Sequence, residues 1–262
     1  MKNRIDISVG RYWDKPWSLV SSCTRCSDGC KNCWSLAMEK RFKKGIEGKI
    51  EVRPDRLDIP LQTRKPTVFA VWNDLFHEAV PDEFRNKAYS VMDQCRHHTF
   101  LILTKRTTIA EYIKRVDMFW RLPNIYHGLT VCNQDEWAGK KKWFLQVQCI
   151  LTGKLFVSHE PALERIDYGD DLKRIAVLIS GGETGSGARP SHPDIFRADR
   201  DQCAEAGVNF FFKQWGDVVH NSHPCFDNYT CDRGEASYWI GRKKSGRLLD
   251  GRTHDDLPWV RG

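Results

Sequence analysis

TFLILT, at Thr99–Thr104, is one of six short apolar runs whose spacing decides the fold of this 262-residue chain. The others are TVFAVW at Thr67–Trp72, IYHGLTV at Ile125–Val131, KLFVS at Lys154–Ser158, IAVLIS at Ile175–Ser180 and VNFFFK at Val208–Lys213. These runs are rich in β-branched and aromatic residues and nearly continuous in apolar character, as strands buried on both faces are. The sequence therefore predicts a set of short buried strands.

Amphipathic segments separate several of these runs. Those that we interpret as helices are Asp82–His97, Thr107–Phe119, Asn133–Ile150 and a segment that starts near Pro193 and ends at Gly207. Strand–helix alternation at this spacing implies a parallel sheet with right-handed crossovers. We expect an α/β fold, a full or partial parallel (β/α) barrel, with an open doubly wound sheet as the alternative.

The end of the chain has a different composition. From about Asp217 the sequence is rich in Gly, Asp, Arg and Asn, and its periodicity is weak. We expect residues 1–216 to form the barrel domain and residues 217–262 to form an irregular extension that packs on it.

Composition limits the class of protein. Hydrophobic residues make up 40% of the chain, which is enough for one sizeable core. We see no apolar run of the roughly 20 residues that a membrane helix needs, and the N-terminus lacks the apolar region of a signal peptide. We expect a soluble cytoplasmic protein that does not bind a membrane. The formal net charge of +7 favours a polyanionic partner, most simply nucleic acid.

Four of the ten cysteines lie close together in the segment CTRCSDGCKNCW, at positions Cys23, Cys26, Cys30 and Cys33. Structural zinc usually draws on two CxxC pairs that a longer loop separates. Compact cysteine runs are more typical of iron–sulfur clusters. The spacing predicts a cluster, with zinc as the alternative. The other six cysteines are expected to be buried as small hydrophobic residues: Cys95, Cys132, Cys149, Cys203, Cys225 and Cys231.

Polar residues follow almost every predicted strand. They include Asn73, the pair Lys105-Arg106, Glu160 and the triplet Gly181-Gly182-Glu183. A barrel carries its chemistry at the carboxyl ends of its strands. Carboxylates and paired cations that recur at this edge therefore indicate a site, whereas an ordinary polar loop remains the plainer interpretation.

The cysteine spacing resembles that of a known enzyme superfamily. Cys26-x3-Cys30-x2-Cys33 is similar to the signature of radical S-adenosylmethionine (SAM) enzymes. The resemblance implies that three cysteines hold a 4Fe–4S cluster whose open iron binds SAM. It also implies an external electron donor such as a flavodoxin. A fourth cysteine ligand would argue against SAM chemistry.

Nearly the whole chain also resembles a narrower family, the phage and bacterial three-cysteine-motif proteins of unknown function, which are thought to be related to radical SAM enzymes. The similar blocks are SSCTRCSDGCKNCW, WNDLFHEAVPDEF, FLILTKR, HGLTVCNQ, FVSHEP, ISGGETGSGARPSHPD, FFFKQWG and GRLLDGR. In that family the cysteine spacing maps onto Cys23, Cys30 and Cys33. The two resemblances therefore disagree on whether Cys23 or Cys26 is the first ligand.

The superfamily resemblance also suggests cofactor contacts at the strand ends. A GGE-type stretch binds the SAM amino group in radical SAM enzymes, although there it follows an early strand and here it follows a late one. This implies that Gly181, Gly182 and Glu183 bind SAM, with Glu160 as a second candidate for the same role. Lys105 could hold a phosphate or the SAM carboxylate, and Asn73 is a further candidate cofactor ligand.

A substrate class follows from charge and resemblance together. The run Lys40-Arg41-Phe42-Lys43-Lys44 should form a basic helix beside the cysteines, suited to a DNA or RNA backbone. The tryptophans that could stack on a base are Trp13, Trp17, Trp34, Trp72 and Trp215. We expect an isomerase or base-modifying enzyme that acts on a thymidine-derived base in phage DNA, in the cytoplasm of a bacterial host. The alternatives are a DNA-repair lyase of the photoproduct-lyase kind and a non-catalytic zinc- or cluster-containing nucleic-acid-binding protein.

Overall fold

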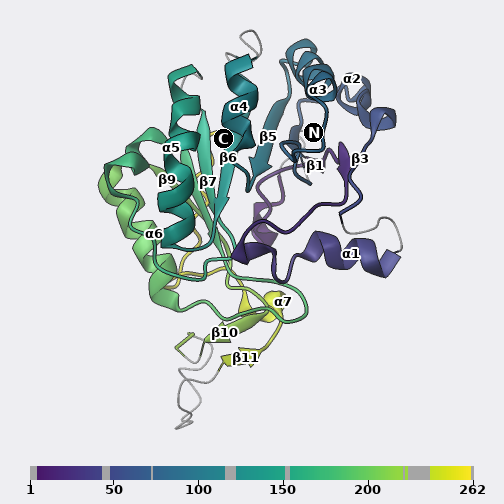
Figure 1. Ribbon diagram of the computed structural model, residues 1–262. Coiled ribbons are helices and arrows are strands. Elements are labelled where there is room, and N and C mark those ends of the chain that lie inside the picture. Colours follow the sequence, from purple (N-terminus) through teal and green to yellow (C-terminus); the bar gives the residue numbers. More distant parts are fainter. Residues whose placement is uncertain are drawn as a thin grey trace.

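The computed structural model describes residues 5–42, 48–71, 73–115, 122–150, 154–220, 222–223 and 237–260, with the side chains of 147–150 left aside (Figure 1). Its main feature is one seven-stranded parallel sheet that forms a half-barrel. The strands are β1 (Lys15–Pro16), β4 (Val68–Val71), β5 (Thr99–Thr104), β6 (Ile125–Val131), β7 (Leu155–His159), β8 (Val177–Gly181) and β9 (Asn209–Gln214), paired in this order. All carboxyl ends therefore meet at one edge.

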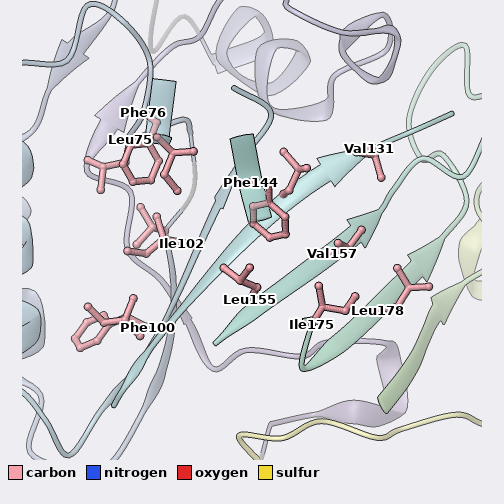
Figure 2. Packing of buried hydrophobic residues seen from close by; sticks show 14 of the residues in the cluster. Leu75, Phe76, Phe100, Ile102, Val131, Phe144, Leu155, Val157, Ile175 and Leu178 are labelled. Carbon is pink, nitrogen blue, oxygen red and sulfur yellow. The ribbon is translucent and has the colours of Figure 1, made fainter. Parts of the chain in front are cut away.

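Helices cover the outer face of this sheet (Figure 1). They are α3 (Asp82–Gln94), α4 (Thr108–Arg115), α5 (Gln134–Ile150) and α6 (Pro193–Ala206), while a 3₁₀ helix, η4 (Gly169–Arg174), connects β7 to β8. Figure 2 shows strand side chains such as Ile102, Val157 and Leu178 in the larger core. Alternate strand positions point this way, as the two-residue period of a strand requires.

The inner face of the sheet has its own core. Leu101, Phe156 and Phe211 point into it from β5, β7 and β9. The two ends of the chain fill it, because Tyr12 and Trp259 pack there and the Trp259 indole Nε1 donates to the Tyr12 carbonyl at 2.9 Å. Residues around Tyr12 and Trp259 thus occupy the space that further strands of a closed barrel would enclose.

The remaining elements are short and lie around the sheet. They are η1 (Ile7–Val9), β2 (Val20–Ser21), η2 (Asp28–Cys30), α1 (Trp34–Phe42), β3 (Glu51–Val52), η3 (Pro54–Arg56), α2 (Ile59–Gln62), β10 (Val218–His220), β11 (Ser237–Trp239) and α7 (Arg242–Ser245). Strands β2 and β3 pair with each other, and β10 pairs with β11.

The predicted parallel α/β sheet is confirmed. TFLILT and IYHGLTV are strands with the predicted bounds, and the other four runs are strands shifted or shortened by one or two residues. The barrel is partial, and the doubly wound alternative is wrong because the strand order never reverses. The helix expected at Asp82–His97 ends at Gln94, and α6 ends at Ala206 before Gly207, whose φ is +67°. Residues 116–119 of another predicted helix lie outside the described residues.

The part of the chain that the structure describes contains no helix with the length and apolar character needed to cross a bilayer.

A buried histidine gives the fold a testable pH dependence. His127 lies in β6, 1% exposed, with its Nε2 2.8 Å from the Tyr89 hydroxyl, and burial lowers its pKa to about 3. In the unfolded chain a histidine pKa is about 6.5. The unfolded state therefore takes up the proton first, and the folded state loses stability as the pH falls from about 6.5 towards 3.

We predict that the stability advantage of the natural protein over His127→Gln shrinks by about 2 kcal/mol between pH 6.5 and 4.5. Urea unfolding of both proteins across this range measures the difference and cancels the titration of the other groups. An advantage that is independent of pH would contradict the neutral, buried state of His127.

Candidate functional site

The segment that carries the four cysteines, residues 23–33, is called the cysteine loop below. Its Gly29 lies directly on the carboxyl edge of the sheet. A Cβ atom added to Gly29 would be 2.3 Å from the Cys132 Sγ and 3.2 Å from both the Lys105 Nζ and the Pro161 Cδ. These three residues follow β6, β5 and β7, respectively. Only glycine allows the loop backbone to approach three neighbouring strand ends so closely.

Polar anchors from the start of α5 hold the neighbouring residue, Asp28. The Asn133 Nδ2 donates to the Asp28 Oδ2 at 3.0 Å, and the Asp28 backbone N–H donates to the Glu136 Oε1 at 3.1 Å. Asn133 also accepts from the Glu136 backbone N–H at 2.9 Å, which caps the start of α5. The capping group of this helix is thus also an anchor of the cysteine loop.

A second set of anchors comes from the end of β8. The Glu183 carboxylate accepts from the backbone, Nε and Nη2 groups of Arg189 at 2.7, 2.8 and 2.6 Å. It also accepts from the Asn32 Nδ2 at 3.1 Å, and Arg189 donates onward to the Asp28 carbonyl at 3.0 Å. These charge-assisted hydrogen bonds lower the pKa of Glu183 despite its burial. Glu183 therefore ties the cysteine loop to β8.

A third set of anchors follows β4 and β5. The Arg106 Nη2 donates to the carbonyl and hydroxyl oxygens of Thr24 at 3.0 and 2.6 Å, and its Nη1 contacts both Glu78 oxygens. The His77 Nε2 lies 2.8 Å from the same Thr24 hydroxyl. Asp74 is buried nearby, with its Oδ2 3.7 Å from the Arg106 Nε. Arg106 thereby fixes the start of the cysteine loop.

Asp74 connects the residues that follow β4 and β5. It accepts from the Thr104 hydroxyl at 2.7 Å and from the backbone N–H groups of Lys105 and Phe76 at 3.2 and 3.0 Å. Burial raises the pKa of this carboxyl, against the opposing effect of these donors. Asp74 therefore joins the ends of β4 and β5 to the residues that contact the loop.

The thiols differ in exposure and acidity. Cys30 is buried, Cys26 is exposed, and Cys23 and Cys33 are half-buried. A hydrogen bond between the first two raises the pKa of Cys26 and lowers that of Cys30 to about 4, which makes Cys30 the thiolate of the pair. Within the described ranges, no three His, Cys, Asp or Glu side chains are arranged to hold a single metal ion.

Lys105 places a positive charge beside the cysteine loop. Burial acts to lower its pKa, but the opposing effects of Cys132, Cys30, Glu136 and Cys33 together outweigh it and raise the pKa. Lys105 is therefore a cation held against the cysteine loop.

The structure brings some of the predicted site residues together and separates others. Lys105 and Glu183 both meet the cysteine loop, as described above. Glu160 instead pairs with the Lys213 Nζ at 2.5 Å. Asn73 contacts the N-terminal elements, because its Nδ2 donates to the Val20 carbonyl at 2.7 Å and its Oδ1 accepts from the Ser35 hydroxyl at 2.7 Å.

Close packing explains the two glycines of the GGE triplet. A Cβ at Gly182 would lie 1.9 Å from the Trp215 carbonyl oxygen, and one at Gly181 would lie 3.3 Å from the Lys213 Cβ. The end of β8 therefore requires small residues beside the end of β9, whether or not a ligand binds there.

Only some of the proposed nucleic-acid-binding residues lie in the described part of the chain. Lys40 and Arg41 are exposed near the end of α1, whereas Lys43 and Lys44 lie outside the described residues, as does Trp72. Trp17 and Trp215 are 0% and 3% exposed, so both belong to the core and cannot stack on a base.

Several anchors were missed at the sequence level: Asp28, Asn32, Cys132, Glu136 and Arg189. Asp28 and Asn32 lie between the cysteines, and Arg189 follows the GGE triplet by six residues. All of them except Glu136 lie inside the sequence blocks quoted above, which was the only signal of their role, since their contacts join residues far apart in the chain. Cys132 is buried as expected, but it lies beneath the cysteine loop.

The cysteine loop and all its anchors fall within one stretch that matches a family described as "Protein of unknown function (DUF5131)", over residues 8–258. The chain belongs to the DUF5131 family. No curated protein and no solved structure matched this DUF5131 chain. The family assignment covers the half-barrel and carries no reaction with it.

We predict that Gly29→Ala displaces the cysteine loop and that adding Cys132→Ala partly restores its position. The added methyl group would collide with the Cys132 sulfur, and such overpacking typically costs about 1–3 kcal/mol. Hydrogen exchange of the amides of residues 26–33 measures docking. Exchange should be faster in the single variant and slower again in the double variant, and identical exchange in all three proteins would contradict the contact.

Proposed function

We infer that this chain is a radical SAM enzyme whose cysteine loop holds a 4Fe–4S cluster and whose substrate is a nucleobase. The observation that carries this inference is the docking of the loop, through Gly29, onto the carboxyl edge of a parallel half-barrel. Parallel α/β barrels carry their reactive groups at this edge. The loop that bears the thiols therefore lies where a substrate could meet a cofactor.

The donor chemistry of the loop fits a cluster. Thiolates are the ligands of iron–sulfur clusters, and Cys30 is already the more acidic partner of a hydrogen-bonded thiol pair. Cys23 interacts electrostatically with Cys30, and Lys105 does so with Cys30 and Cys33. Because each ligand of a cluster binds a different iron, the thiols need not converge on one point. Cys30 and Cys33 would be ligands, together with Cys23 or Cys26.

When bound, such a cluster would supply the electron for reductive cleavage of SAM. The chain would contribute positioning. Lys105 would place a cation beside the thiolates, where it could also receive the SAM carboxylate. Glu183 could accept the SAM ammonium group only if it shares or gives up part of its contact with Arg189. Glu160, held by Lys213, is the second candidate for the ammonium group.

The substrate assignment rests on charge and on the sequence resemblance. A net charge of +7 favours a polyanion, and the exposed residues Lys40 and Arg41 lie near the end of α1, the helix that follows the cysteine loop. A thymidine-derived base in phage DNA, isomerised or otherwise modified with an electron donor such as a flavodoxin, suits this combination. Such a base must be flipped out of its duplex to reach the loop.

We predict that anaerobically reconstituted protein contains about four irons per chain and a brown charge-transfer band. Cys30→Ala should lose both, whereas Cys95→Ala, which removes a buried thiol at the end of α3, should keep them. Iron analysis and absorption spectra measure the result. Stoichiometric zinc with no uptake of iron would contradict the proposal and favour a structural zinc site.

We predict that Glu183→Gln weakens SAM binding by about ten- to a hundredfold without changing the iron content. Loss of a hydrogen bond to a charged group costs roughly 1.5–3 kcal/mol. Equilibrium dialysis with SAM provides the measurement, with Glu160→Gln as the parallel variant. Loss of iron from Glu183→Gln would show that this carboxylate only anchors the loop, and a SAM defect confined to Glu160→Gln would transfer the role to Glu160.

A further inference from the structure

Helix α1 carries an exposed apolar strip, called here the α1 ridge. It consists of Trp34, Met38 and Phe42, which are 47%, 49% and 53% exposed. Their spacing of four residues places them on one face of the helix. The opposite side of the helix is fixed to the protein, because Leu36 is buried. The ridge starts at the residue after Cys33, and in Figure 1 α1 projects to the side of the half-barrel.

Within the described residues of α1, Trp34–Phe42, the outward-facing charged side chains are positive. Glu39 is the only acidic residue in the sequence of α1, and its Oε1 accepts from the Ser22 backbone N–H at 2.7 Å, so it faces the protein. Lys40 and Arg41 are exposed, and the Arg41 guanidinium lies 5.5 Å from the centre of the Phe42 ring. Lys31, in the cysteine loop, is exposed as well. The outward surface of α1 is therefore both apolar and positive.

We propose that the α1 ridge is the docking surface for a single-stranded segment of nucleic acid. Bases would stack on Trp34 and Phe42 while Lys40 and Arg41 contact phosphates. Aromatic platforms flanked by cations bind single strands because every base has a stacking face and every linkage has a negative charge. A strand held here would present a neighbouring unstacked base to the cysteine loop. The last point rests on the proposed function, whereas the docking itself does not.

Two features favour a nucleic acid over a protein or a membrane. The outward face of α1 carries cations and no acidic side chain that could pair with a basic protein surface. The negatively charged backbone of a nucleic acid complements these cations. The strip is three side chains long on a helix of nine residues, which matches a few bases better than the broad apolar face that an interfacial helix inserts into lipid.

The test is binding of a fluorescein-labelled, thymidine-containing 20-nucleotide single strand, measured by anisotropy at several salt concentrations. Trp34→Ala should weaken binding by about five- to a hundredfold, as loss of a base-stacking contact does, with little change in the salt dependence. Lys40→Gln combined with Arg41→Gln should reduce the slope of log K against log salt by about 1.4. Trp239→Ala is the matched control, because Trp239 is 58% exposed on β11.

Equal affinity of the Trp34→Ala and Trp239→Ala proteins would overturn the inference. So would binding to anionic phospholipid vesicles, or self-association, that depends on Trp34 while DNA binding does not. Circular dichroism of each variant confirms folding. Iron content and SAM cleavage without DNA, measured on the same preparations, test the proposed function separately. DNA binding that depends on Trp34 in a protein without iron would preserve this inference and reject the radical mechanism.

Discussion

The contact between Gly29 and the ends of β5, β6 and β7 is the constraint on which the rest of the candidate site depends. Because no side chain fits there, the backbone of the cysteine loop rests directly on the sheet. Asp28 on one side and Asn32 on the other can then reach anchors after β6 and β8. The position of the thiols is thus set by the register of several strands, and a shift in any one of them would move the loop.

Several anchors of the cysteine loop are ion pairs. Arg106 lies between Glu78 and Asp74, and Arg189 lies against Glu183. Buried ions are tolerated when they are paired and hydrogen-bonded, and removing one partner leaves the other uncompensated. These pairs therefore bind the loop and also make its position sensitive to any ligand that competes for one of the carboxylates.

The strands were predictable because runs such as TFLILT are buried on both faces and carry their own signal. Strand β1 was not, since Lys15–Pro16 is only two residues long and both are exposed at the sheet edge. A partial barrel was one of the predicted outcomes, but the reason for it was hidden, because Tyr12 and Trp259 meet across almost the whole length of the chain. The cysteine loop of the candidate site was visible in sequence as a local group of four cysteines. Its anchors were not, because pairs such as Asn32 and Glu183 are brought together only by the fold.

The packing of Trp259 against Tyr12 and Phe156 has a consequence for synthesis. The inner core draws on the first and the last described parts of the chain, so a nascent chain can build its strands and outer helices but cannot complete the concave side until residue 259 has left the ribosome. Until then Phe156 and Phe211 lack their final cover. Exposed apolar surface on incomplete chains promotes aggregation. The interval between synthesis of β9 and emergence of residue 259 is therefore the one in which these side chains stay exposed.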